Sequence, residues 1–131
     1  MTLSTGSEFS ITENNKELRL TLDSGTIDVP LYLEDTKMYY TASHPSTIRG
    51  WYINGDVSGS LVLDIWKKQA GIPTNTDSIC GTEKPTLTAQ QQNSDTKLDT
   101  WTTNIEIGDT LGFEVESVVD ITRAVLTIKL A

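Results

Sequence analysis

The sequence is poor in the residues that most enzyme chemistry requires. It has one cysteine, Cys80, and one histidine, His44, among 131 residues. A single cysteine cannot form an intramolecular disulfide, and neither residue has neighbours at the spacing of a zinc site or a catalytic pair. No serine lies in a nucleophile-elbow motif. We therefore predict no catalytic residue, no metal site, no cofactor and no enzymatic activity, and a reducing compartment.

Basic residues and long apolar runs are also scarce. The chain has 10 Lys and Arg against 18 Asp and Glu, a formal net charge of −8. This charge repels a phosphate backbone, and Lys67-Lys68 is too short a basic run to offset it. No apolar run approaches the roughly 20 residues of a membrane span, and residues 1–8 lack the pattern of a signal peptide. We expect neither direct nucleic-acid nor membrane binding, and assembly in the cytoplasm.

Most of the sequence shows the alternation of apolar and polar residues that is typical of β-strands. An alternating segment is typical of a sheet with one buried face and one wet face. Glycine, proline and asparagine turn signals separate the segments every 8–12 residues. The pattern predicts an all-β fold, an antiparallel β-sandwich of jelly-roll-like type. The alternating segments are residues 18–22, 27–33, 38–41, 47–54, 58–67, 101–105, 111–115 and 124–130.

Two segments depart from this alternation. Residues 1–15 are polar, and their apolar residues are Met1, Leu3, Phe9 and Ile11. We predict that they form an extended N-terminal arm ahead of a sandwich domain at residues 16–131, and that these four side chains bind a partner. The polar composition of residues 69–98 predicts a long loop, and residues 88–97 within it could form a helical turn.

The aromatic residues are the main candidates for a binding surface. Alternation places Trp66 on the face opposite Leu61, Leu63 and Ile65. With Tyr52 and Tyr39 it is a candidate aromatic interface or sugar platform, although packing in the core or between subunits is the favoured interpretation for the tryptophans. His44 is predicted as a loop residue. Seven aspartates are predicted as solvated turn residues, because none has calcium-loop spacing: Asp56, Asp64, Asp77, Asp95, Asp99, Asp109 and Asp120.

An ordered series of motifs in the last 80 or so residues resembles a small β-sandwich module of tailed-bacteriophage virion proteins. The first 45 or so residues match no family pattern and lack the repetitive stalk of a fibre. The matching motifs include Gly50-Trp51-Tyr52-Ile53, Ser58-Gly59-Ser60, Ile65-Trp66-Lys67, Asp77-Ser78-Ile79, Glu83-Lys84-Pro85, Trp101-Thr102-Thr103, Gly108-Asp109 and Thr122-Arg123.

The resemblance implies a virion structural protein. Because the module is nearly the whole chain, a capsid decoration (cement) protein on the capsid exterior is favoured. Such a protein stabilises the head as a homo-oligomer, a trimer or a dimer, that binds across subunits of the major capsid protein. An arm like residues 1–15 can add a strand to a neighbour's sheet edge. The alternative is a receptor- or carbohydrate-binding module at the tail tip or fibre, with a host-surface glycan as ligand.

Overall fold

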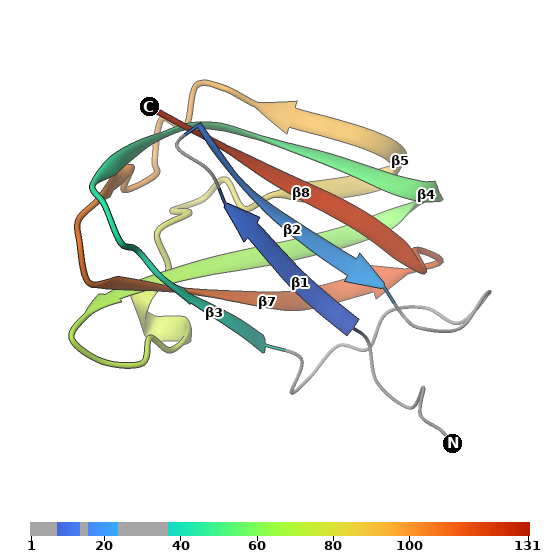
Figure 1. Ribbon diagram of the computed structural model, residues 1–131. Helices are drawn as coiled ribbons and strands as arrows, with labels where there is room; N and C mark the ends of the chain where they lie inside the picture. The colour runs from blue at the N-terminus through green and yellow to red at the C-terminus, as the bar shows by residue number, and fades with distance from the viewer. Residues whose placement is uncertain (1–7, 14–15, 24–36) are drawn as a thin grey trace, which may run out of the picture.

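One antiparallel sheet folds over on itself and nearly closes into a barrel (Figure 1). The computed structural model describes residues 8–13, 16–23 and 37–131. The strand order is β1-β2-β8-β4-β7-β3, and β5 and β6 each pair with β4. The prediction of an all-β antiparallel fold is confirmed. The strands are β1 (Glu8–Glu13), β2 (Glu17–Asp23), β3 (Lys37–Thr41), β4 (Ser46–Gln69), β5 (Thr86–Asp95), β6 (Asn104–Ile105), β7 (Asp109–Val119) and β8 (Arg123–Leu130).

The long strand β4 belongs to both layers of the fold. Its first half pairs with β8, from Ile48 opposite Leu130 to Gly55 opposite Ala124. Its second half pairs with β7, starting at Ser60. Figure 1 shows the two halves meeting at a bend, with β7 and β8 turning beside them. The sequence pattern predicted two strands separated by a turn near Asn54. The structure instead keeps one bent strand there, with register shifts in its pairing to β5.

Specific contacts hold the bend. Gly59 is buried, and a Cβ atom there would lie 2.5 Å from the backbone oxygen of Val119. Asp56 accepts hydrogen bonds from the amides of Thr122 and Arg123, each at 3.2 Å, and from the Thr122 hydroxyl. Burial alone would raise the pKa of Asp56, but these hydrogen bonds outweigh it and hold the pKa below its usual value. Specific side-chain and backbone contacts therefore stabilise the bend.

The core lies between the two layers and follows the predicted alternation. The inward-facing residues of β2, β4, β7 and β8 are almost fully buried, whereas many residues between them are exposed or half-buried. Because side chains alternate across a strand, one face of each strand fills the core. The buried set includes Leu18, Leu20, Leu22, Leu61, Leu63, Ile65, Leu111, Phe113, Val115, Ala124, Leu126 and Ile128.

Two predicted segments differ from the structure. The predicted loop at residues 69–98 contains β5, and the helical turn allowed at residues 88–97 is wrong, because residues 86–95 pair with β4 instead. The short 3-10 helix η1 (Asn75–Asp77) lies earlier in that segment. In the predicted arm, residues 8–13 form β1, which pairs with β2 along its whole length. The strand predicted at residues 27–33 lies outside the described residues.

Candidate functional site

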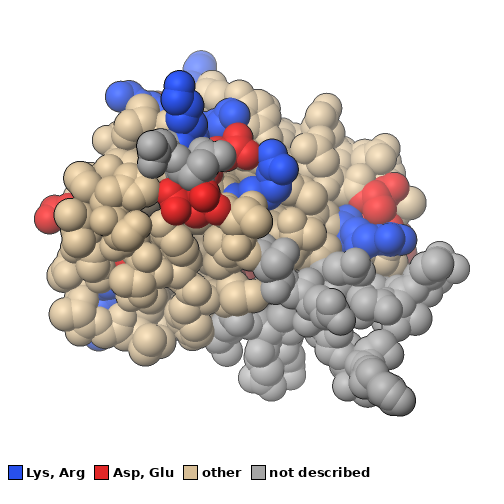
Figure 2. All heavy atoms as spheres, viewed as in Figure 1, with Lys and Arg blue, Asp and Glu red and all other residues tan. Residues whose placement is uncertain are grey.

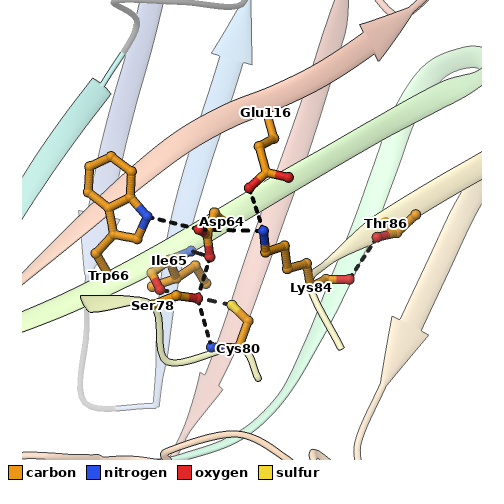
Figure 3. Close-up of polar contacts among 8 residues, drawn as sticks. All are labelled: Asp64, Ile65, Trp66, Ser78, Cys80, Lys84, Thr86 and Glu116. Carbon is orange, nitrogen blue, oxygen red and sulfur yellow. Dashed lines mark hydrogen bonds and ion pairs between the residues drawn. The ribbon is translucent and has the colours of Figure 1, made fainter. Parts of the chain in front are cut away.

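The buried carboxylate of Asp64 organises the outer face of β4. Asp64 is 2% exposed. Its two oxygens accept hydrogen bonds from the indole nitrogen of Trp66 at 2.9 Å, the amide of Ile65 at 2.9 Å and the hydroxyl of Ser78 at 2.6 Å (Figure 3). A buried carboxylate is costly unless such donors surround it. Asp64 thus fixes the Trp66 ring and ties the segment after η1 to the strand.

The tied segment covers this part of the sheet. Ser78 forms a β-bridge with Trp66, and the amide of Ile79 donates to the carbonyl of Ile65 at 2.9 Å. Cys80 is fully buried next to them, and burial raises the pKa of its thiol to about 12. A thiol with so high a pKa is a poor nucleophile at neutral pH. The geometry therefore gives Cys80 a packing role.

Lys84 and Glu116 close the cluster at its solvent side. The Lys84 ammonium lies 2.5 Å from a carboxylate oxygen of Glu116 and 3.8 Å from one of Asp64 (Figure 3). The hydrogen bond that Lys84 donates to Glu116 is the main cause that raises the pKa of Lys84. A charged lysine between two carboxylates balances the cluster, but it is a poor nucleophile or base. This arrangement stabilises structure and offers no reactive group.

The prediction of solvated turn residues is wrong for four of the seven aspartates. Asp56 and Asp95 lie in β4 and β5 rather than in turns, and Asp64 and Asp109 are buried. Asp64 lies within β4 and is buried, as described above. Asp109, at the start of β7, is 4% exposed. Its carboxylate accepts hydrogen bonds from the Gln69 amide at 2.7 Å and the backbone amide of Glu106 at 2.8 Å. Spacing in the sequence gave no sign of the Gln69 donor, because it lies 40 positions from its acceptor.

A shallow pocket lies beside the Asp64 cluster. Its volume is about 350 Å³, and its lining mixes apolar and polar side chains. Trp66 and Tyr39 flank Gly112, which pairs with both of them across the sheet. A Cβ atom at Gly112 would lie 3.1 Å from each ring and 3.2 Å from the Pro73 side chain. The remaining lining comes from Glu114 of β7 and residues 72–75.

The structure brings two of the three predicted platform residues together. Tyr39 is 40% exposed and Trp66 is 2% exposed, and both line the pocket. Tyr52 is 38% exposed, but it lies on the first half of β4 and is not part of this lining. Sequence reasoning missed Glu114, although its place two residues after Gly112 puts it on the same outward face.

The other tryptophans pack as the favoured interpretation predicted. Trp51 and Trp101 belong to the hydrophobic core cluster. The Trp101 indole donates a hydrogen bond to the carbonyl of Glu83 at 2.8 Å. The indole nitrogen of Trp51 is buried, and within the described residues it has no hydrogen-bond partner.

The predicted arm residues are only partly described. Met1 and Leu3 lie outside the described residues. Phe9 lies in β1, where its backbone is opposite Leu22. Ile11 is half-buried and packs against the core cluster of this same chain. This places Ile11 in the chain's own fold, whereas the arm hypothesis gave its side chain to a partner.

Side chains rather than a backbone ladder join β1 to β3 across the remaining opening of the barrel. The carboxylate of Glu13 lies 3.4 Å from Nε2 of His44 and hydrogen-bonds the Tyr40 side chain. His44 is a loop residue, as predicted, and its Nδ1 lies 3.5 Å from the Ser43 hydroxyl. That distance is long for a nucleophile and its base, which meet at about 2.6–3.2 Å. The three side chains therefore act as a closure of the barrel.

Because Tyr40 takes part in this closure, we expect the stability of the fold to decrease with rising pH in the alkaline range. Burial, followed by the charge of Glu13, raises the pKa of Tyr40 above its ordinary value of 10.0. Because folding raises this pKa, its contribution is complete below the ordinary value and is lost as the pH rises through the folded value. We expect Tyr40→Phe to lower the thermal midpoint at neutral pH, and the gap from the wild type to close at strongly alkaline pH. A gap that stays constant in melting curves across this range would contradict the role of Tyr40.

The described residues form no metal centre, and the face shown in Figure 2 has no strong charge patch. Within residues 8–13, 16–23 and 37–131, no group of three His, Cys, Asp or Glu residues is placed to hold a metal ion. Figure 2 shows basic residues in small groups with acidic residues beside them on the face in view. No helix in the described part of the chain is long and apolar enough to cross a membrane.

Comparisons with known proteins place the chain in no family. No protein-family model and no curated protein matches the sequence. One solved structure that aligns with it is RmlC from Streptococcus suis in complex with dTDP-D-xylose. The alignment has 9% identity, covers 95% of this chain and 71% of that chain, and has a TM-score of 0.26. A likeness this weak carries no argument about function.

Proposed function

We propose that this chain is a structural protein of a bacteriophage virion, specifically a capsid decoration (cement) protein. In this role it sits on the capsid exterior as a homo-oligomer and binds across subunits of the major capsid protein. It stabilises the head without a cofactor, nucleic acid or membrane. The proposal rests first on the motifs of residues 50–123, which resemble a phage virion module.

The observation that supports a structural role is that the motif residues form hydrogen bonds with one another. Asp56 meets Thr122 and Arg123 at the bend, and Glu83 accepts a hydrogen bond from Trp101. Among the motif residues that the structure describes, these polar contacts join strands and loops to one another. Residues that serve an enzyme instead converge on a shared cleft with perturbed pKa values suited to catalysis. The distribution of these polar contacts supports a structural protein, which acts through its shape and its binding surfaces.

Strand β5 offers a route by which the protein grips a neighbour. Among the described strands, β5 pairs only with β4, so its second edge has no strand partner. An unpaired edge is a template on which another chain can add a strand. The strand carries a single charged residue, Asp95, in a chain with a net charge of −8. A neighbouring subunit therefore meets less electrostatic repulsion here than over the rest of an acidic surface.

The deciding experiment is the copy number of the protein in purified virions. Quantitative mass spectrometry against the major capsid protein measures it directly. We expect a simple ratio to the capsid subunits. A complete absence from purified virions would overturn the virion proposal.

The pocket beside Trp66 supports a second candidate function, a receptor- or carbohydrate-binding module at the tail tip. Pockets that pair aromatic side chains with a few polar groups are typical of small-molecule sites. The same copy-number measurement separates the two candidates. A handful of copies per particle would place the protein at the tail and reject the decoration role.

A further inference from the structure

Strand β5 leaves one edge of the sheet open. Among the described strands it pairs with β4 alone, and Figure 1 shows it at the margin of the fold, where it follows the bend of β4. Beyond Ala89, which has a φ of 49°, residues 90–94 are exposed or half-buried. In the described part of the chain, no hydrogen bond from outside β4 reaches the backbone of these five residues. One row of their amides and carbonyls is therefore available to another strand.

This open edge lacks the features by which proteins protect a strand from further pairing. Charged side chains, above all lysine, and prolines block many exposed edges. Residues 90–94 are Gln-Gln-Gln-Asn-Ser, without a charge or a proline. The one charged residue of β5, Asp95, follows them, and its carboxylate accepts a hydrogen bond from the Lys97 amide at 2.9 Å. The edge is therefore polar, neutral and open along five residues.

The chemistry of these five residues favours an identical strand as the partner. Each glutamine or asparagine amide both donates and accepts hydrogen bonds, so the strand is complementary to itself. A basic partner would find no carboxylate to bind along residues 90–94. A second copy of the chain, with its own net charge of −8, meets the least repulsion where the edge is neutral.

We propose that two copies of the chain form a dimer by pairing their β5 edges antiparallel across a two-fold axis at Gln92. Such an axis keeps each face of the joined sheet on its own side, so opposite residues are an even number of positions apart in the sequence. With Gln92 opposite its own copy, Gln90 lies opposite Ser94 of the partner subunit. Asp95 then lies at each end, outside the five neutral residues. The inference rests on the proposed decoration role, whose homo-oligomer it specifies as a dimer.

The side chains at the centre of this edge are already held by their own sheet. Gln92 is exposed and donates a hydrogen bond to the Asn54 side chain at 2.7 Å, and Gln91 donates one to the carbonyl of Gly55 at 3.2 Å. Side chains that are ordered before association lose less conformational entropy when a partner binds. The Gln92 amide oxygen is an acceptor that can meet the amide of its copy across the axis.

Disulfide trapping of the full chain tests this register. Gln92→Cys places two thiols opposite each other at the axis, within the roughly 4.4–6.8 Å between Cα atoms that a disulfide spans. Ser94→Cys is the matched control on the same face, because the two copies of residue 94 would lie about 14 Å apart at about 3.4 Å per residue. The native Cys80 is buried. We expect oxidation to convert most of Gln92→Cys to a dimer on a non-reducing gel and to leave Ser94→Cys monomeric.

Self-association in solution is the second measurement. In sedimentation equilibrium we expect the wild type to form a dimer. Gln92→Lys should weaken this association roughly tenfold or more, because two ammonium groups would meet at the axis. The lysine still offers a donor to Asn54. Ser117→Lys is the control with the same charge on an exposed serine of β7, and it should dimerise like the wild type.

Three results would overturn the β5 dimer: a monomeric wild type, equal cross-linking of Gln92→Cys and Ser94→Cys, or a dimer that Gln92→Lys leaves intact. Cross-linking of Gln92→Cys to the major capsid protein in virions, with none between copies, would assign the edge to that partner instead. The copy number decides the decoration role separately. A protein absent from virions can form this dimer, and a decoration protein can lack it.

Discussion

Replacing Asp64 with alanine is expected to lower the free energy of unfolding by about 3–5 kcal/mol, the range for removing one partner of a buried charged network. The substitution leaves the Trp66 indole, the Ile65 amide and the Ser78 hydroxyl without their acceptor. Buried donors that lose an acceptor incur their full desolvation cost. Urea unfolding followed by tryptophan fluorescence measures the change.

Asp99→Ala is the matched control for this prediction. Asp99 carries the same carboxylate, but it is exposed. Surface substitutions of this kind usually change stability by less than about 0.5 kcal/mol. If Asp64→Ala behaves like Asp99→Ala, the buried cluster does not hold the covering segment. In that case the hydrogen bond from Trp66 to Asp64 is not needed to hold the pocket beside Trp66 either.

Replacing Gly59 with valine is expected to lower the free energy of unfolding by about 3 kcal/mol or more, the upper end of the range for overpacking. The new Cβ would lie 2.5 Å from the Val119 backbone oxygen and 2.9 Å from two atoms of Ile121. Ile121 is fully buried, so neither neighbour can move aside freely. Relief requires β4 and β7 to separate at the bend that joins the two layers.

Gly71→Ala provides the comparison. A Cβ atom there meets only the flexible side chain of Lys68, at 3.3 Å or more, and Gly71 is exposed. We expect its thermal midpoint to remain near that of the wild type. If Gly59→Val unfolds with the same midpoint as Gly71→Ala in a differential scanning calorimeter, the close approach of β4 and β7 is not required for the fold.

The two variants also separate stability from the proposed functions. Gly59 lies at the bend, remote in the sequence from the pocket-lining residues 72–75, whereas Asp64 supports the pocket through Trp66. A partly destabilised but folded Asp64 variant is therefore expected to alter the pocket beside Trp66 as well. Loss of the bend would instead disturb both layers and, with them, the exposed edge of β5.

Several parts of the fold were predictable because strand alternation is a local property. Leu61, Leu63 and Ile65 face the core, and Trp66 and Asp64 face outward, as their spacing predicts. The burial of Asp64 was not predictable, because its cover comes from Ser78, which reaches back 14 positions. The helical turn at residues 88–97 was wrong for a related reason. Pairing with β4 overrides the weak local preference of the glutamines.

The candidate pocket shows the same division. The sequence alone indicated Tyr39 and Trp66 as aromatic candidates, but it gave Tyr52 equal weight. Only the register of β3 and β4 against β7 places Tyr39 and Trp66 on either side of Gly112. Tyr52 follows the first half of β4 into the other layer. Tyr52 and Trp66 are separated by the bend in β4, and no local sequence pattern predicts that bend.

By itself, the sequence determined that this protein is an all-β, acidic chain with one face of each strand buried, because residue type and period-two spacing are read within a few positions. The tertiary structure decided which strands are neighbours, where β4 bends and which carboxylates are buried. Those features depend on contacts between distant residues, such as Asp56 with Thr122, 66 positions apart. A hydrogen bond of that kind exists only after the chain has brought the two strands together, so no local pattern of residues encodes it.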